Sequence, residues 1–191
     1  MSVPATKRAI RVLWNLFRIM EKATIMKTQR AVRMRQVVDW SAAVWAGIIA
    51  GSAFLLLNLL LTPLFIGGNT WVMVRLFGSL LLGDDILAPP STFDRGALIA
   101  AIVTNFALSI AFALILAIII HRWGFITGVT VGALFGLALY GINFYSLTYF
   151  FPWFFAMRSS VFLATHIIFG ALAGGIYEGL EVEEFVPVTD N

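Results

Sequence analysis

Two histidines, His121 and His166, are the residues best suited to bind a cofactor. His166 lies near the start of a long apolar run, on the same helical face as Gly170 and Gly174. At that depth it either hydrogen-bonds a neighbouring hydroxyl or carbonyl, or marks a quinone, haem-edge or proton-path site. His121 lies at the opposite membrane face, about 20 Å away at ~1.5 Å per residue. One haem iron therefore cannot bridge the pair, and His166 is the one candidate cofactor ligand.

Three carboxylates, Asp84, Asp85 and Asp94, lie between the first two long apolar runs. Carboxylate oxygens suit calcium or magnesium, but turn formation and helix capping explain all three without a metal. Ser91 and Asp94 read as a capping box, in which Ser91 accepts from a free backbone N–H and Asp94 reaches back. The chain has no cysteine and no HExxH, phosphate-loop, dinucleotide or nucleophile-elbow motif. We therefore expect no enzyme activity, no cofactor and no metal.

Three asparagines, Asn58, Asn105 and Asn143, fall in three different apolar runs. Each needs a hydrogen-bonding partner, because bilayer hydrocarbon offers none. They either join helices to one another or line a polar path together with His166. A transport path normally adds charged groups near the midplane, and the runs contain no other ionisable residue there.

Small residues recur at every fourth position and predict close helix packing. The expected packing residues are Gly47, Gly51, Ala101, Asn105, Ser109, Gly124, Gly128, Gly132, Gly136, Gly170 and Gly174. The turn at residues 121–124 is short, so the glycine stripe of the third run is expected to pack on the small face of the second. Packing against another protein is the alternative.

Residues 143–155 are dense in aromatic side chains. Interfacial belts of Trp and Tyr are normal in membrane proteins, so this run is either a plain belt or a surface for a partner protein or an isoprenoid lipid. A quinone or an isoprenoid lipid is a possible partner of the chain. The candidate surface residues are Trp71, Tyr149, Phe151, Trp153 and Phe154.

The composition indicates what must position these residues. Of 191 residues, 60% are hydrophobic and 12% charged, and the apolar runs are long enough for helices that cross ~30 Å of hydrocarbon. We predict an all-α, polytopic transmembrane four-helix bundle at residues 39–180. Its spans are expected at about 40–65, 97–120, 125–150 and 160–180. The outer segment 69–94 contains a helix too short to span, at 71–82, which is interfacial or re-entrant.

Basic residues are concentrated before the first span. Nine of the thirteen Lys and Arg residues lie there, so the positive-inside rule places both termini in the cytoplasm. Residues 1–38 should form an amphipathic helix, from Ile10, that lies on the anionic inner leaflet of the membrane. This position explains the charge without nucleic acid. Residues 181–191 form an acidic cytoplasmic tail, and Glu178 is expected to pair with Arg122 or His121.

Three segments carry a resemblance: PPSTFD at 89–94, NFYSLTYFFPWF at 143–154 and THIIFG at 165–170. They resemble uncharacterised small four-span bacterial membrane proteins. The resemblance implies a bacterial inner membrane and no particular activity, so no residue takes a role from it.

Abundant packing surfaces without catalytic motifs favour a non-catalytic accessory or structural subunit of a larger bacterial membrane complex, such as a respiratory or photosynthetic energy-transducing one. The alternative is a small transporter or channel with a polar path lined by Asn58, Asn105, Asn143 and His166. An enzyme acting on lipid or quinone ranks last, because His166 and the outer carboxylates are expected at different depths.

Overall fold

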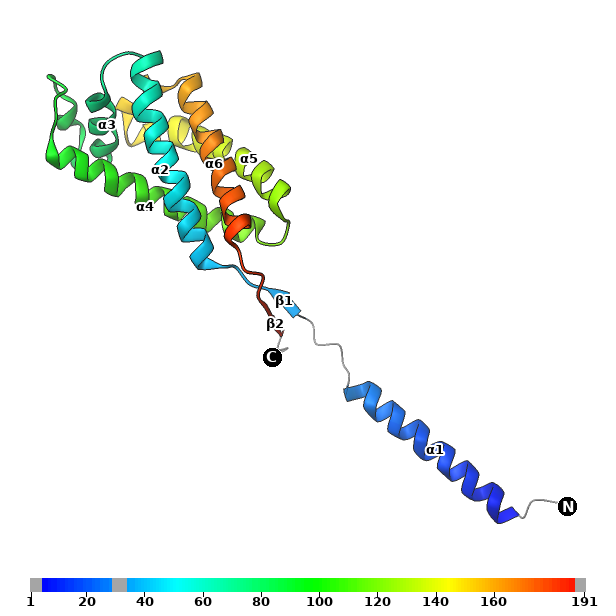
Figure 1. The fold of residues 1–191 in the computed structure, drawn as a ribbon. Coiled ribbons are helices and arrows are strands. Elements are labelled where there is room, and N and C mark those ends of the chain that lie inside the picture. The colour runs from blue at the N-terminus through cyan, green and yellow to red at the C-terminus, as the bar shows by residue number, and fades with distance from the viewer. Residues whose placement is uncertain (1–4, 29–33, 188–191) are drawn as a thin grey trace. The chain divides into compact units, whose positions relative to one another are not determined.

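A computed structural model describes residues 5–28 and 34–187, and within the first helix the side chains of residues 10 and 13–23. The structure is about 80% helical and all-α apart from two short strands. Its main elements, shown in Figure 1, are α1 (Ala5–Thr28), β1 (Met34–Gln36), α2 (Trp40–Phe65), α3 (Thr70–Leu82), α4 (Arg95–Ile120), α5 (Phe125–Gly141), α6 (Ser160–Leu180) and β2 (Phe185–Pro187).

The chain divides into two compact units. The first contains α1 and the two-stranded sheet in which β1 pairs with β2. On α1, Trp14 and Phe17 stack with their ring centroids 6.0 Å apart, and Ile10 and Leu13 are exposed. Of the segments expected at the ends of the chain, residues 29–33, with Arg30 and Arg33, and 188–191, with Asp190, lie outside the described residues.

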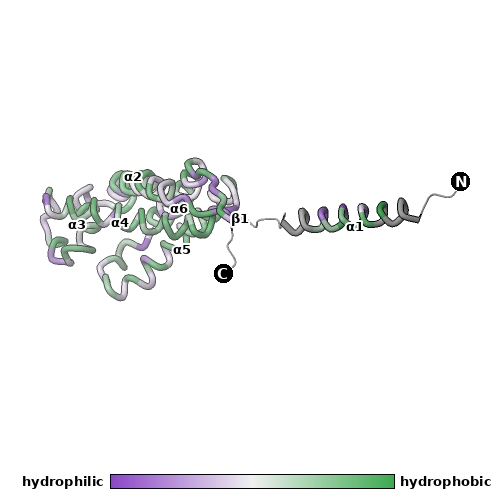
Figure 2. The backbone as a smooth tube through the Cα atoms, turned by 90° about the horizontal axis from the view of Figure 1, so that it is seen from below, coloured by the Kyte–Doolittle hydropathy of each residue, from purple (hydrophilic) through white to green (hydrophobic). Residues whose placement is uncertain are grey.

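The second unit, residues 36–184, holds four helices long and apolar enough to cross a membrane: Trp40–Phe65, Arg95–Ile120, Phe125–Tyr149 and Ser160–Leu180. Figure 2 shows that apolar residues dominate these helices along their length. They fit a multi-pass membrane protein.

The helix starts follow local capping chemistry. Asp39 accepts from the backbone N–H groups of Ser41 and Ala42, both at 3.0 Å, at the start of α2. At α4 the cap is Asp94, whose Oδ1 accepts from Ala97 N at 2.7 Å. The expectation that Ser91 caps this helix is wrong, because α4 begins at Arg95 and Asp94 itself occupies the N-cap position.

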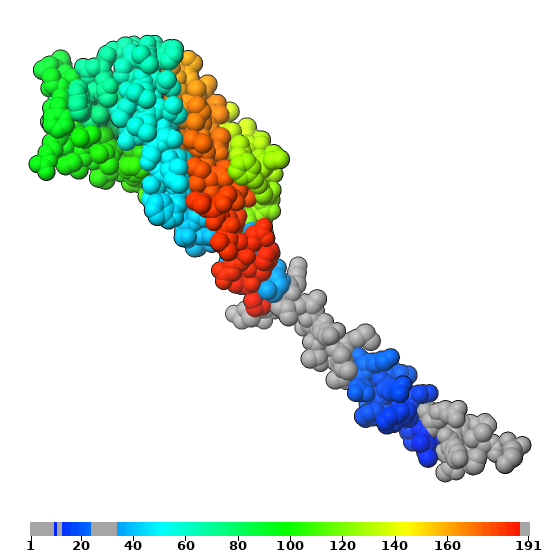
Figure 3. Space-filling view, viewed as in Figure 1, coloured from blue at the N-terminus to red at the C-terminus, as the bar shows by residue number. Residues whose placement is uncertain are grey.

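Neighbouring long helices run antiparallel. Gly47 of α2 lies against Ile110 of α4, and Gly51 lies against Ser109, so rising numbers on one helix meet falling numbers on the other. Figure 3 shows α2 beside α6 on one face of this unit, and Val182 N donates to Asp39 Oδ2 at 3.2 Å. Residues 36–39 and 181–184 therefore meet at one end of the bundle, which we call the terminal end.

The opposite end, called the α3 end, contains the helix expected to be interfacial or re-entrant. α3 is 13 residues long and buries Met73, Phe77 and Gly78. A Cβ on Gly78 would lie 2.7 Å from the carbonyl oxygen of Ala97, so α3 packs directly on the first turns of α4. Arg75 Nη1 donates to Ile86 O at 2.8 Å and holds the loop that follows α3.

Candidate functional site

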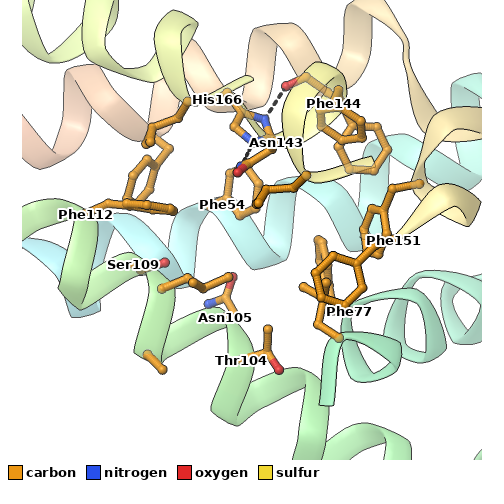
Figure 4. A pocket seen from close by; sticks show the side chains of 18 of the residues that line it. Phe54, Phe77, Thr104, Asn105, Ser109, Phe112, Asn143, Phe144, Phe151 and His166 are labelled. Atoms are coloured by element: carbon orange, nitrogen blue, oxygen red, sulfur yellow. Dashed lines mark hydrogen bonds between the residues drawn. The ribbon is translucent and has the colours of Figure 1, made fainter. Parts of the chain in front are cut away.

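A cavity of about 350 Å³ opens in the bundle where α4 and α5 diverge. Eight phenylalanines line it, contributed by α2, α3, α4, α6 and the segment after α5. Figure 4 shows Phe77 and Phe151 on one side of this cleft and Phe112 on another. We call this space the α4–α5 cleft.

Two polar walls face each other across the α4–α5 cleft. Thr104, Asn105 and Ser109 come from α4, and Asn143 and His166 lie opposite them (Figure 4). Asn105 Nδ2 donates to Gly51 O at 3.0 Å, which fixes the orientation of its amide. The residues lining the cleft include no Lys, Arg, Asp or Glu, and His166 is the one titratable side chain among them.

The hydrogen bonds of His166 define its tautomer. Its Nδ1 lies 2.7 Å from Phe162 O, which can only accept, so Nδ1 carries the proton. Nε2 is then an acceptor, and Asn143 Nδ2 donates to it at 3.1 Å. The Phe54 ring packs edge-on against His166 with centroids 4.9 Å apart. His166 is thus a neutral, positioned polar group.

A π-helical turn at Ile142–Ser146 places Asn143 in the cleft. It continues α5 directly after Gly141, and Leu147 N bonds to Ile142 O to close the wider turn. Inserted turns of this kind rotate the following side chains relative to a regular helix and are frequent at functional sites. The expected span of 125–150 is therefore helical throughout but not regular.

The mouth of the cleft is apolar. The exposed residues among its lining are Leu81, Val103, Ala107, Leu108 and Leu147. Val103, Ala107, Leu108 and Leu147 belong to two of the four candidate spanning helices and Leu81 to α3, so the cleft opens on the side of the bundle between these helices.

The four residues of the expected polar path do not form one path. Asn105, Asn143 and His166 line the cleft, whereas Asn58 does not. Asn58 is fully buried between α2 and α6, where Thr165 Oγ1 donates to its Oδ1 at 3.2 Å. Asn58 therefore joins two helices.

Gly128, Gly132 and Gly136 of α5 contact α6 and not α4, so the expected partner helix was wrong. A Cβ on Gly132 would overlap the carbonyl oxygen of Gly170, and one on Gly136 would overlap that of His166. A Cβ on Gly128 would lie 2.5 Å from Glu178 Cγ. The small face of α4 packs elsewhere: Ser109 lies against Gly51, and Ala101 is buried in the cluster that includes α3.

Gly124 is not a packing residue. Nothing lies within 4 Å of a Cβ built on it, and its φ of +79° is the left-handed conformation that side chains disfavour. It forms the turn that starts α5. The remaining glycine of the α6 stripe, Gly174, lies against Gly128 and Gly132.

The expected aromatic surface separates into buried and exposed parts. Phe154 is buried and Phe151 lines the cleft. Trp153 Nε1 donates to Ser79 Oγ of α3 at 2.9 Å, and Trp71 packs edge-on against Phe93. Tyr149 alone of the five is highly exposed, at 86%.

A second aromatic group lies within the run 143–155 that the sequence analysis selected, and Arg158 beside it was the residue that the analysis missed. Tyr145, Phe150 and Phe155 are exposed like Tyr149. Arg158 packs on Tyr145 and Phe155, and Phe150 packs edge-on against Tyr149. The guanidinium carbon of Arg158 lies 4.1 Å from the Tyr145 ring centroid and 4.0 Å from that of Phe155. The sequence did contain a signal for this arrangement: Arg158 follows the aromatic run 143–155 closely, and arginine side chains stack on aromatic rings.

The acidic residues considered as metal ligands or ion-pair partners have structural roles or no such partner. Asp94 is the helix cap described above, and among the described residues no group of three or more His, Asp or Glu side chains could hold a metal. Within the same residues, Glu178 forms no ion pair with Arg122 or His121, and its Oε1 is buried without a hydrogen bond. Arg122 Nε instead donates to His121 Nε2 at 3.0 Å. The expected ion pair of Glu178 was wrong because the α5–α6 contact draws its side chain over Gly128.

A polar cluster closes the terminal end. Glu181 Oε1 accepts from Tyr177 OH at 3.1 Å and from Gln36 Nε2 at 3.2 Å, and Asp39 N donates to Tyr177 OH at 3.4 Å. The backbone N–H of Ala42 lowers the pKa of Asp39. Burial raises the pKa of Glu181, against the lowering effect of the Tyr177 hydroxyl. We call Gln36, Asp39, Tyr177 and Glu181 the terminal clasp.

No protein family, curated protein or solved structure gives a significant match to this chain.

Proposed function

We propose that this chain is a non-catalytic accessory or structural subunit of a larger complex in a bacterial inner membrane, energy-transducing complexes being the first candidates. The observation that carries the proposal is a group of four exposed rings, of which Tyr145 and Phe155 pack on Arg158 and Tyr149 and Phe150 pack on each other. Tyr145, Tyr149, Phe150 and Phe155 are 64%, 86%, 69% and 60% exposed. We call these four rings the aromatic surface.

Two rings of the aromatic surface, Tyr145 and Phe155, are held by Arg158. Arg158 Nε donates to Phe144 O at 2.6 Å, and its Nη2 donates to Thr148 Oγ1 at 3.4 Å. These bonds fix the guanidinium between the Tyr145 and Phe155 rings. A belt that only anchors a helix in lipid needs no such scaffold. Fixed aromatic and Arg side chains are the residues that dominate binding energy at protein interfaces, because little entropy is lost when they bind.

The distribution of buried polar groups favours assembly over transport. Thr62, Ser79, Thr104, Asn105, Ser109, Thr165 and His166 all lie in the middle or toward the α3 end. The terminal half is packed by Ala42, Ala46, Ala117 and other apolar residues. A solute crossing the bundle would meet an apolar core in this half before it reached Glu178 and the terminal clasp, and within that core it would lack polar partners.

The proposal includes an orientation and a lipid contact. Both termini face the cytoplasm, and α1 lies on the anionic leaflet, since the basic residues before α2 outnumber those of the outer loops. Residues 36–39 and 181–184 meeting at the terminal end supports one side for both ends.

Co-purification from the native membrane tests the assembly role. The chain with Tyr149→Ala and Phe150→Ala is compared with the parent after mild detergent extraction, and the readout is the mass and stoichiometry of the complex. We expect the parent to elute with a stoichiometric membrane partner and the double variant to lose it.

The matched control is Leu64→Ala with Phe65→Ala. These residues are 76% and 72% exposed at the end of α2 that also lies at the α3 end, so they present similar apolar area at a similar depth. The control should retain the partner. A monodisperse parent without a partner, or equal loss in both double variants, contradicts the proposal.

A further inference from the structure

We infer that the α4–α5 cleft is a binding site for a membrane quinone, meaning a neutral ring that carries oxygens and a long apolar tail. This site is separate from the aromatic surface, since none of its four exposed rings lines the cleft. The inference therefore stands or falls independently of the assembly role.

The size and lining of the cleft fit a ring. Its volume of about 350 Å³ is within the usual range for small-molecule sites, roughly 300–1,000 Å³. Phe54, Phe77 and Phe151 are among its eight phenylalanines. Flat rings gain edge-to-face and offset contacts with such side chains beyond the area that they bury.

The polar walls fit a ring with oxygens at opposite ends. Asn105 and Thr104 stand on α4, and Asn143 and His166 stand across the cleft from them (Figure 4). The bond of Asn105 to Gly51 and that of Asn143 to His166 each use one amide hydrogen. Each amide retains a second N–H that can donate to an oxygen. A ring with oxygens on both sides can therefore be held from both walls.

The electrostatics select a neutral ligand. The lining contains no Lys, Arg, Asp or Glu among the described residues, and both ring nitrogens of His166 are already hydrogen-bonded as a neutral imidazole. A phosphate or carboxylate head would be desolvated there without a counter-charge, which is costly. Phospholipids and fatty acids are therefore poor candidates for the polar floor.

The apolar mouth of the cleft fits the long apolar tail of a quinone. Leu81, Val103, Leu108 and Leu147 are apolar and exposed at the mouth. A ligand dissolved in the bilayer can insert its ring between α4 and α5 and leave its tail in the hydrocarbon. A polar floor behind an apolar mouth matches a quinone, whose polarity is confined to the ring.

Titration of the full chain in lipid nanodiscs with an alkyl-tailed benzoquinone tests the site. Bound quinone is measured by equilibrium partition, and the second probe is the alcohol of the same alkyl chain, which lacks the ring. We expect saturable quinone binding at one site and affinity for the alcohol lower by about tenfold or more, since it lacks the ring contacts and one oxygen.

Two alanines on α4 provide a matched pair of variants. Ala107 and Ala111 are both exposed, one helical turn apart, and only Ala107 lines the cleft. Ala107→Phe should fill the mouth and weaken quinone binding about tenfold or more, while Ala111→Phe should change it less than about twofold. Both variants face lipid, so both should fold, which their melting temperatures check.

Three results would overturn the inference: no saturable binding of the quinone to the parent chain, equal affinity for the ringless alcohol, or equal effects of the two phenylalanine variants. The second result would assign the cleft to an ordinary lipid chain. Loss of the assembly partner in the Tyr149 and Phe150 variant leaves the quinone result unchanged, so failures of the two proposals are distinguishable.

Discussion

The helix pairs α5–α6 and α4–α5 show opposite outcomes for the same kind of sequence. Both pairs combine helices with small residues at every fourth position. In α5–α6 the glycines of both helices meet, and the backbones touch at Gly132 and Gly170. In α4–α5 the helices share a four-residue turn but diverge and leave the cleft. Close packing therefore follows the match between two surfaces and not proximity along the chain.

The physical reason lies in what each face presents. Between α5 and α6, glycine meets glycine, so the axes can approach until backbone atoms are in contact and gain dispersion energy. The small face of α4 is already used by Gly51 of α2 and by Gly78 of α3. On the side of the cleft α4 contributes Leu108 and Phe112 together with Asn105 and Ser109, so it offers no continuous small face there for the glycines of α5.

A substitution in the tight pair has the largest expected effect. Gly132→Ala places a Cβ on the Gly170 carbonyl oxygen and should lower the free energy of unfolding by about 2 kcal/mol as an overpacking change. The measurement is reversible unfolding in mixed micelles with a denaturing detergent.

The control lies on the same helix. Gly141, the last residue of α5, has nothing within 4 Å of an added Cβ and a helical φ of −57°. Gly141→Ala should leave stability equal or raise it by about 0.5 kcal/mol, because alanine restricts the unfolded chain. If both variants unfold alike, the α5–α6 contact is looser than described here.

Two buried threonines allow a comparison between the hydrogen-bonded contact of α2 with α6, at Thr165, and the wall of the cleft, at Thr104. Thr165→Val removes the donor to Asn58 Oδ1 and leaves that oxygen buried without a partner, at a cost of about 1–2 kcal/mol. Thr104 Oγ1 is buried without a hydrogen bond, so Thr104→Val should be neutral or stabilising by up to about 1 kcal/mol. The same unfolding measurement checks both. An equal loss in the two variants would mean that Thr104 has a partner in the membrane, such as a ligand or water.

The smallest effect is expected from pH at the terminal clasp, which holds α2 and α6 together at their ends. Burial raises the pKa of Glu181 above its ordinary value of 4.5, so the native state binds the proton more tightly than the unfolded chain does. Stability should therefore decrease as the pH rises from 4.5 through the native pKa. Asp39 has the opposite sign: its lowered pKa gives stability that is complete above 3.8 and is lost as the pH falls through the native value.

Glu181→Gln isolates the first of these effects. The glutamine oxygen can still accept from Tyr177 and Gln36, so the clasp is kept while its titration is removed. The free energy of unfolding of the parent should decrease between pH 4.5 and neutral pH, and that of the variant should not. We expect the two proteins to differ by less than about 1 kcal/mol, because the clasp is partly exposed to solvent. An unchanged pH profile in Glu181→Gln would show that another group titrates there.

Much of the fold was predictable, because the run lengths and the caps are local properties. The four spans appear close to their expected bounds, with α4 starting two residues earlier than expected because Asp94 is the cap. The candidate site was predictable only in part. Asn105, Asn143 and His166 were selected as buried polar groups, but their convergence on one cavity depends on the π-helical turn and on the divergence of α4 from α5.

The sequence by itself determined how many apolar helices form, where they begin, and which faces are small enough to pack, since each property is encoded within one segment. The tertiary structure decided which small face meets which. Four striped helices allow several pairings, and only the simultaneous fit of Gly132 to Gly170 and of Gly51 to Ser109 selects one. The same selection buried Phe154, exposed Tyr149 and formed the α4–α5 cleft, because a helix packed on two neighbours is held away from a third.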